Sequence, residues 1–173
     1  VKIDTSWNEN LLILHFPEIK SVNISLIKNE IPCLIVGVEK NKIGHIKELH
    51  EQVCNMETLK GLKMILYVEH TVNAGDLATA LWRFCNNLDP KRDFHLFKKY
   101  NENGKYIACM GLDGTRKTKE YDNFQRDWPN IIVADDKTIT AVDAKWDRLG
   151  IGSFIASPSL KYKDQLYGEE AAV

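Results

Sequence analysis

The sequence lacks long hydrophobic runs and any excess of charge of one sign. Its longest purely apolar runs are about five residues, whereas a membrane-spanning helix needs roughly 20. The formal net charge is −1, so the strong basic excess typical of a nucleic-acid-binding protein is absent. Only the block 90–126 is mildly basic, with a net charge of +4. We therefore expect neither a transmembrane protein nor a protein that binds nucleic acid.

The sequence also has no CxxC pair and no dense cysteine framework. Its four cysteines, each in an apolar context where a free thiol behaves as a small hydrophobe, are Cys33, Cys54, Cys85 and Cys109. They indicate reduced thiols in a cytoplasmic protein. The N-terminus shows no basic region followed by an apolar one, so no secretory signal is expected. The chain does not begin with Met, and we expect it to be a piece of a longer protein.

What is present suits one globular domain. The 173 residues are 44% hydrophobic and 27% charged, and a chain of this length buries about 70% of its unfolded surface. We expect a linker remnant at 1–15, an α/β domain at 16–155 and a C-terminal tail or arm at 156–173.

The hydrophobic pattern predicts strands alternating with helices. Strands are expected where apolar residues alternate or run together, at 22–26, 33–38, 64–68, 94–97 and 106–110, with a turn at 101–104. Helices are expected at 43–56, from Asp76 to the Asp89-Pro90 stop, and from Asp136 through Leu149. The second of these would bury the stripe Leu77, Leu81, Phe84, Cys85 and Leu88. The order predicts a single three-layer α/β domain with a central, mostly parallel or mixed sheet flanked by helices.

Two short stretches carry chemistry-bearing residues. Glu69 and His70 follow a predicted buried strand, with Asp76 close behind, at the strand end where α/β sheets place their sites. A structural turn and a helix cap account for the same residues. Gly111 to Lys117 combines two glycines, a hydroxyl and two cations, which suits either an anion-binding loop or a mobile basic loop. The residues alone leave both alternatives open.

Several motifs in register resemble one enzyme family. Asn73-Ala74-Gly75-Asp76, Leu81-Trp82 and Asp89-Pro90-Lys91-Arg92-Asp93 resemble "N-A-x-D … W … D-P-x-R-D" of the UbiD-like decarboxylases. Met110 to Lys117 resembles that family's "M-G-[LI]-D-A-T-x-K". Phe16 to Ile19 and Gly44 to Lys47 are similar to its "P-E-I" and "P-G-H-A-[KR]". The resemblance spans roughly residues 16–150 and falls on the C-terminal α/β domain of the family.

The resemblance implies an enzyme that removes CO2 from an aromatic acid, such as a polyprenylated 4-hydroxybenzoate in ubiquinone or menaquinone biosynthesis. Enzymes of this family use prenylated FMN with Mn2+ and K+. Their catalytic, flavin and metal residues lie in the two preceding domains, so the resemblance implies no catalytic, cofactor-binding or metal residue in this chain. We expect the chain alone to be inactive, and to act as the oligomerisation and cleft-closing domain of the full-length carboxy-lyase.

The matched motifs supply three cleft-side candidates: Lys47, Asp113 and Lys117. The partners implied are the N-terminal domains of the same enzyme and further copies in a dimer or hexamer, with peripheral membrane association through a lipophilic substrate. Departures include Glu69-His70-Thr71 in place of a run of acids, and Gly114 in place of the family's Ala. The alternative is a stand-alone α/β module that binds a small anion or a protein partner.

Overall fold

The computed structural model describes residues 8–59, 61–100, 104, 106–126, 128, 129 and 131–166. The chain divides into two compact units, residues 1–127 and 128–173, and each is described by itself. Within the described residues, no helix has both the length and the apolar character needed to cross a membrane.

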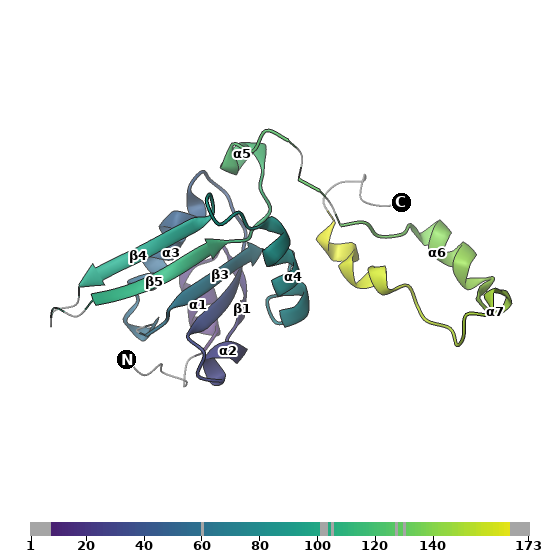
Figure 1. Ribbon diagram of the computed structural model, residues 1–173, viewed down its shortest axis with the longest axis horizontal. Coiled ribbons are helices and arrows are strands. Elements are labelled where there is room, and N and C mark those ends of the chain that lie inside the picture. Colours follow the sequence, from purple (N-terminus) through teal and green to yellow (C-terminus); the bar gives the residue numbers. More distant parts are fainter. Residues whose placement is uncertain are drawn as a thin grey trace. The chain divides into compact units, whose positions relative to one another are not determined.

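A five-stranded mixed sheet forms the centre of the first unit (Figure 1). Its strands are β1 Ile19–Asn23, β2 Cys33–Val38, β3 Met64–Glu69, β4 Phe94–Tyr100 and β5 Tyr106–Asp113, in the order β1-β2-β3-β5-β4. The inner pairs β2-β3 and β3-β5 are parallel. The outer pairs β1-β2 and β4-β5 are antiparallel. The predicted strand at 33–38 is therefore confirmed to the residue, and the sheet is mixed.

Helices cover both faces of the sheet. The first unit contains α1 Asn10–His15, α2 Ser25–Lys28, α3 His45–Cys54, the 3-10 turn η1 Glu57–Leu59, α4 Leu77–Asn87 and α5 Lys119–Asp122. Alternate residues of β2 and β3 belong to different cores, because successive side chains of a strand point to opposite faces. Val36 and Tyr67 pack in the core that includes α3, whereas Ile35 and Leu66 pack in the core that includes α4. The predicted three-layer α/β class is confirmed.

Three local predictions are wrong in detail. The alternating segment 22–26 is not one strand, because β1 ends at Asn23 and Ser25 begins α2. Ile43 precedes α3 and is exposed, rather than lying on its buried stripe. On α4 the buried side chains are Thr79, Ala80, Arg83, Phe84 and Asn87.

Leu77 and Leu81, expected in the buried stripe of α4, are exposed instead. Cys85, also expected in that stripe, is exposed as well, and so is Trp82. The face of α4 that packs against the sheet is therefore not its most apolar one. It carries both polar and apolar side chains.

The second unit has short helices: α6 Asp136–Asp143, α7 Trp146–Leu149 and the 3-10 segment η2 Pro158–Gln165. The one helix predicted from Asp136 through Leu149 is thus two, and its N-cap is Asp135, which accepts from the Thr138 amide. Gly150 ends α7 with a φ of +63°. Of the turn predicted at 101–104, only Gly104 lies within the described residues. The division at residues 16 and 156 stays a prediction; residues 1–7 and 167–173 lie outside the described part.

Candidate functional site

Charged side chains gather at one edge of the sheet. The parallel strands β2, β3 and β5 end together, so Lys40, Glu69 and Asp113 lie at or just beyond the same edge. Strand β4 runs antiparallel to β5, which brings Asp93, just before its first residue, to that edge as well. Parallel strand ends are where α/β proteins build their sites. Asp93, Glu69 and Asp113 are each less than a tenth exposed.

Asp113 and Lys117 form the centre of this group. The Lys117 ammonium lies 3.0 Å from the Asp113 carboxylate and 3.5 Å from that of Asp93, and its side chain is 1% exposed. Thr115 donates its backbone amide to Asp113 at 2.9 Å and its hydroxyl to the same oxygen. Burial favours a higher pKa for Asp113, but Lys117, Lys40 and the Thr115 hydrogen bonds hold that pKa below its ordinary value.

Lys40 supplies the second buried cation. It donates to both carboxylate oxygens of Asp122 at 2.7 Å, and to the Arg116 carbonyl at 2.8 Å. Burial lowers the pKa of Lys40, and the attraction of Asp113 and Asp122 opposes that effect. These contacts tie the last residue of α5, and the segment before that helix, to the residues that follow β2. Two segments distant in the sequence thus close one side of the group.

Glu69 belongs to a neighbouring network. Arg83 donates from Nε to Glu69 at 2.9 Å, and also from a terminal nitrogen. Asn87 donates to the other Glu69 oxygen and to the Gly114 carbonyl, each at 3.1 Å. Sequence reasoning missed Arg83 and Asn87. Their spacing of four residues on one predicted helix face, opposite a buried glutamate, was the available signal.

A pocket of about 140 Å³ opens beside these charges. Its lining residues are Lys40, Lys42, Gly44, His45, Ile46, Lys47, Arg92, Asp93, His95, Asp113, Tyr121 and Asp122. The first turn of α3 therefore lines it, and the partial positive charge of a helix N-terminus adds to the lysines. Burial lowers the pKa of His95, against the attraction of Asp113 and Asp93. The arrangement suits a small anionic group.

The pocket contains two of the three predicted cleft-side residues. Lys47 and Asp113 line it, and Lys47 is exposed. Lys117 lies behind Asp113, buried between the two aspartates. Lys117 can therefore hold the Asp113 carboxylate in place, whereas Lys47 and Asp113 can contact a ligand directly.

The two other stretches singled out in the sequence have structural partners. Asp76 caps α4 by accepting from the Thr79 amide at 3.2 Å, and Glu69 is paired with Arg83. Gly111 to Asp113 belong to β5, and Thr115 and Lys117 are buried. The segment from Gly111 to Lys117 is thus largely built into the edge of the sheet, unlike the mobile basic loop that the residues also allowed.

The pocket does not fit the cofactors of the UbiD-like family by itself. Pockets for organic ligands run from about 300 Å³ upward, so a volume of about 140 Å³ holds a small group and not a whole flavin. Its three carboxylates each face a cation: Asp113 faces Lys117, Asp93 faces Arg92 and Asp122 faces Lys40. A hard cation such as Mn2+ prefers carboxylate oxygens free to bind it, and here the lysines and the arginine occupy them.

Comparison with protein families gives one match. The family described as the 3-octaprenyl-4-hydroxybenzoate carboxy-lyase C-terminal domain matches residues 8–113. An uncharacterized protein of Aquifex aeolicus is 30% identical over 124 residues, which cover 67% of this chain and 25% of that protein. An uncharacterized protein of Archaeoglobus fulgidus is 24% identical over 147 residues, covering 80% of this chain and 30% of that one.

Among solved structures, the fold is similar to that of the vanillic acid decarboxylase of Sedimentibacter hydroxybenzoicus in its closed form. The TM-score is 0.59 at 13% identity, and the match covers 83% of this chain and 31% of that enzyme. The chain therefore spans about a quarter to a third of the length of these proteins.

Proposed function

The chain belongs to the UbiD family of carboxy-lyases, as the C-terminal domain of that family, and from this premise we propose that it is the oligomerisation and cleft-closing domain of a full-length non-oxidative decarboxylase. The observation that carries the proposal is the family match over 8–113. Its relatives are three to four times longer than the matched part, which leaves room for the domains that would hold prenylated FMN, Mn2+ and K+.

The proposed contribution of this chain is one wall of the substrate cleft. The pocket gathers Lys47, Lys42 and Arg92 around the first turn of α3. Cations placed in this way can attract the carboxylate of an aromatic acid, since a charge-assisted hydrogen bond is about twice as strong as a neutral one. Asp113, held ionised by Lys117, can orient Lys47 or accept a hydrogen bond from a phenolic hydroxyl. The substrate class we propose is an aromatic acid, such as a polyprenylated 4-hydroxybenzoate in quinone biosynthesis.

The test is the substitution Lys47→Ala in the full-length enzyme that carries this domain. We expect KM for the aromatic acid to rise about tenfold, which corresponds to one lost charge-assisted contact of roughly 1.4 kcal/mol. Lysine at position 28 is exposed at the end of α2 and does not line the pocket, so Lys28→Ala is the matched control. An unchanged KM in Lys47→Ala, or an equal rise in Lys28→Ala, would contradict the cleft-closing role.

A second function, a stand-alone module that binds a small anion, is favoured by the cationic pocket within this chain. Nuclear magnetic resonance titration of the chain alone with benzoate and with inorganic phosphate distinguishes the two. Weak millimolar binding of both agrees with a cleft wall that is completed by other domains. Micromolar binding of phosphate by the chain alone would favour the module instead.

A further inference from the structure

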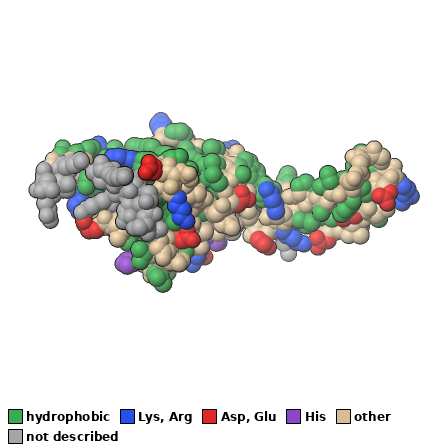
Figure 2. All heavy atoms as spheres, turned by 90° about the horizontal axis from the view of Figure 1, so that it is seen from below, with side chains coloured by type: hydrophobic (Ala, Val, Ile, Leu, Met, Phe, Trp, Pro, Cys, Tyr) green, Lys and Arg blue, Asp and Glu red, His purple; other side chains and the backbone are tan. Residues whose placement is uncertain are grey.

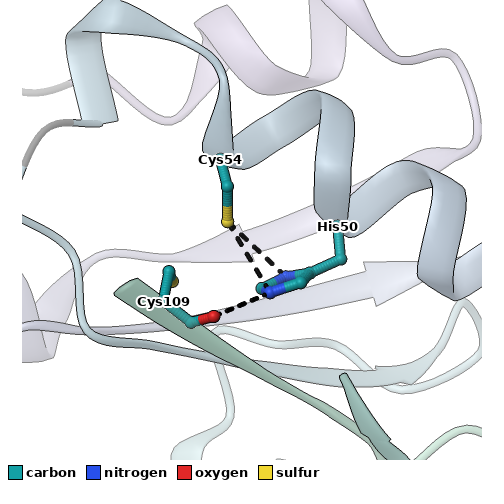
Figure 3. Close-up of side chains that lie close together, drawn as sticks. All are labelled: His50, Cys54 and Cys109. Atoms are coloured by element: carbon teal, nitrogen blue, oxygen red, sulfur yellow. Dashed lines mark hydrogen bonds between the residues drawn. The ribbon is translucent and has the colours of Figure 1, made fainter. Parts of the chain in front are cut away.

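A second cluster of reactive side chains lies away from the pocket, between α3 and the sheet. His50 and Cys54 are four residues apart on α3 and share one face of it. Cys109 lies on β5 beneath them (Figure 3). A ring nitrogen of His50 and the two sulfurs all lie within 4.8 Å of one another. The proposed decarboxylase function gives this cluster no role.

The cluster is buried except at Cys54. His50 is 1% exposed and Cys109 4% exposed, whereas Cys54 is partly exposed. A glycine at position 111 makes room for the ring, because a Cβ there would lie 2.7 Å from Nδ1 of His50. All four cysteines of the chain are free thiols. Two thiols and an imidazole in a shielded site form a soft ligand set.

Hydrogen bonds determine which nitrogen of His50 is available. Nε2 lies 3.2 Å from the Cys109 carbonyl oxygen, which can only accept, so Nε2 carries the proton. Burial keeps the ring neutral, and Nδ1 therefore has its lone pair and accepts from the Tyr67 hydroxyl at 3.0 Å. Metal-binding histidines characteristically donate their other ring N–H to a backbone carbonyl or a carboxylate. His50 already has that arrangement.

We propose that Nδ1 of His50 and the sulfurs of Cys54 and Cys109 form a Zn2+ site that joins the end of α3 to β5. With Zn–S about 2.3 Å and Zn–N about 2.0–2.1 Å, a tetrahedral site separates sulfur from nitrogen by about 3.6 Å. Cys54 Sγ lies 3.7 Å from Nδ1. The Cys109 sulfur lies within 4.8 Å of the Cys54 sulfur and of a ring nitrogen of His50, so a shift of roughly 1 Å would bring it to the spacing of a tetrahedral site.

Binding is a ligand exchange with no change of oxidation state. The two thiols release their protons to solvent as Zn–S bonds form, and Nδ1 exchanges the Tyr67 hydrogen bond for the cation. The fourth position is taken by water or by the Tyr67 oxygen. Because both α3 and β5 contribute to the wall of the pocket, the cation would also hold these two elements in register.

The experiment uses the reduced, chelator-treated chain titrated with Zn2+, with Co2+ as a spectroscopic probe. We expect one Zn2+ retained per chain after desalting, and a thiolate-to-cobalt charge-transfer band with intense tetrahedral d–d absorption. Saturating Zn2+ at a hundredfold excess over Kd should raise Tm by about 5–10 °C. Cys54→Ser and Cys109→Ser should each weaken binding by more than about 100-fold, the upper end of what losing an outer-shell partner costs.

Cys85→Ser is the matched control, because Cys85 is an exposed thiol on α4; it should bind as the wild type does. His50→Gln retains polar atoms in the core and should lose the cobalt spectrum while keeping the fold by circular dichroism. Retention of Zn2+ by Cys54→Ser and Cys109→Ser equal to that of the wild type would overturn the proposal. So would the absence of retained metal in the wild type, or recovery of Cys54 and Cys109 as a disulfide that excludes Zn2+. A negative result for Zn2+ binding would not affect the proposed cleft-closing role, which the KM of Lys47→Ala tests separately.

Discussion

At the scale of residues, the carboxyl edge of the sheet shows how charges are buried in pairs. Lys117 is enclosed by Asp93 and Asp113, Lys40 by Asp122, and Arg83 by Glu69. An unpaired charge in such surroundings costs several kcal/mol. Each buried cation therefore needs its carboxylate partner to remain charged in the folded protein. Figure 2 shows, by contrast, basic and acidic side chains that are dispersed over the surface in this view.

Asp113 should make the stability of the first unit depend on pH in the acid range. Its folded-state pKa lies below the ordinary value, so its contribution is present above about pH 4 and is lost as the pH falls through the folded pKa. Asp113→Asn should lower the free energy of unfolding by about 3 kcal/mol at pH 7, because Lys117 then loses one of its two carboxylate partners. The difference in unfolding free energy between this variant and the wild type should become smaller below about pH 4. Urea unfolding at pH 7, 5 and 3.5 measures it, and a gap independent of pH would contradict this role.

At the scale of elements, polar contacts and not the apolar stripe determine which face of α4 packs against the sheet. Glu69 ends β3 in a buried position and needs partners, which Arg83 and Asn87 on α4 supply. Close packing adds to this, because a Cβ on Gly114 would lie 2.4 Å from Phe84. The helix consequently faces the sheet with Arg83 and Asn87, and its leucines at 77 and 81 are partly exposed. The cost of an unpaired buried carboxylate exceeds the gain from burying two leucines more fully.

The N-cap residue of α4 allows the contribution of a single capping side chain to be measured. The Asp76 carboxylate accepts from the Thr79 amide at 3.2 Å and from its hydroxyl at 2.6 Å. Asp76→Ala should cost about 1 kcal/mol of unfolding free energy, or roughly 2–4 °C in Tm, by thermal unfolding followed with circular dichroism. Asp76→Ser retains a capping oxygen and should recover most of the loss. Equal losses in the two variants would show that the cap is not the cause.

At the scale of the whole molecule, the chain spans about a quarter to a third of the length of the relatives that it matches. The pocket of its first unit is small and cationic. Such a pocket can position the carboxylate of an acid substrate. In our proposal, the electron sink and the proton donor of the decarboxylase lie in the other domains of the full-length enzyme.

The matching prediction is that the chain alone does not retain prenylated FMN. In an absorbance titration with Mn2+ and K+ present, followed by gel filtration, we expect the flavin to separate from the protein, because a pocket of about 140 Å³ holds only a small group. The chain should likewise release no CO2 from aromatic acids. Stoichiometric retention of the flavin would place the cofactor site within this chain, and the Glu69–Asp76 and Asp113–Lys117 segments would then be the positions to mutate.

Local patterns were sufficient for much of the fold. The continuous apolar run at 33–38 predicted β2 to the residue, and the run at 64–68 predicted β3 to within one residue, because strands buried on both faces leave no polar position. Asp76 was correctly predicted as a cap. The prediction of one strand at 22–26 was wrong because the chain turns into α2 there, where the Asn23 side chain accepts from the Ser25 amide. The helix predicted from Asp136 is interrupted after Asp143 and resumes at Trp146.

By itself, then, the sequence determined the α/β class, strands β2 and β3, and the family. Each of these follows from short patterns of residues that are close together in the chain. Tertiary structure alone decided that Lys40, Asp93 and Asp113 meet at one edge, that Lys117 is buried behind the pocket while Lys47 lines it, and that His50, Cys54 and Cys109 converge. These groups come from different strands and helices. Their meeting depends on strand order and on the rotation of each helix, which follow from the packing of the whole sheet.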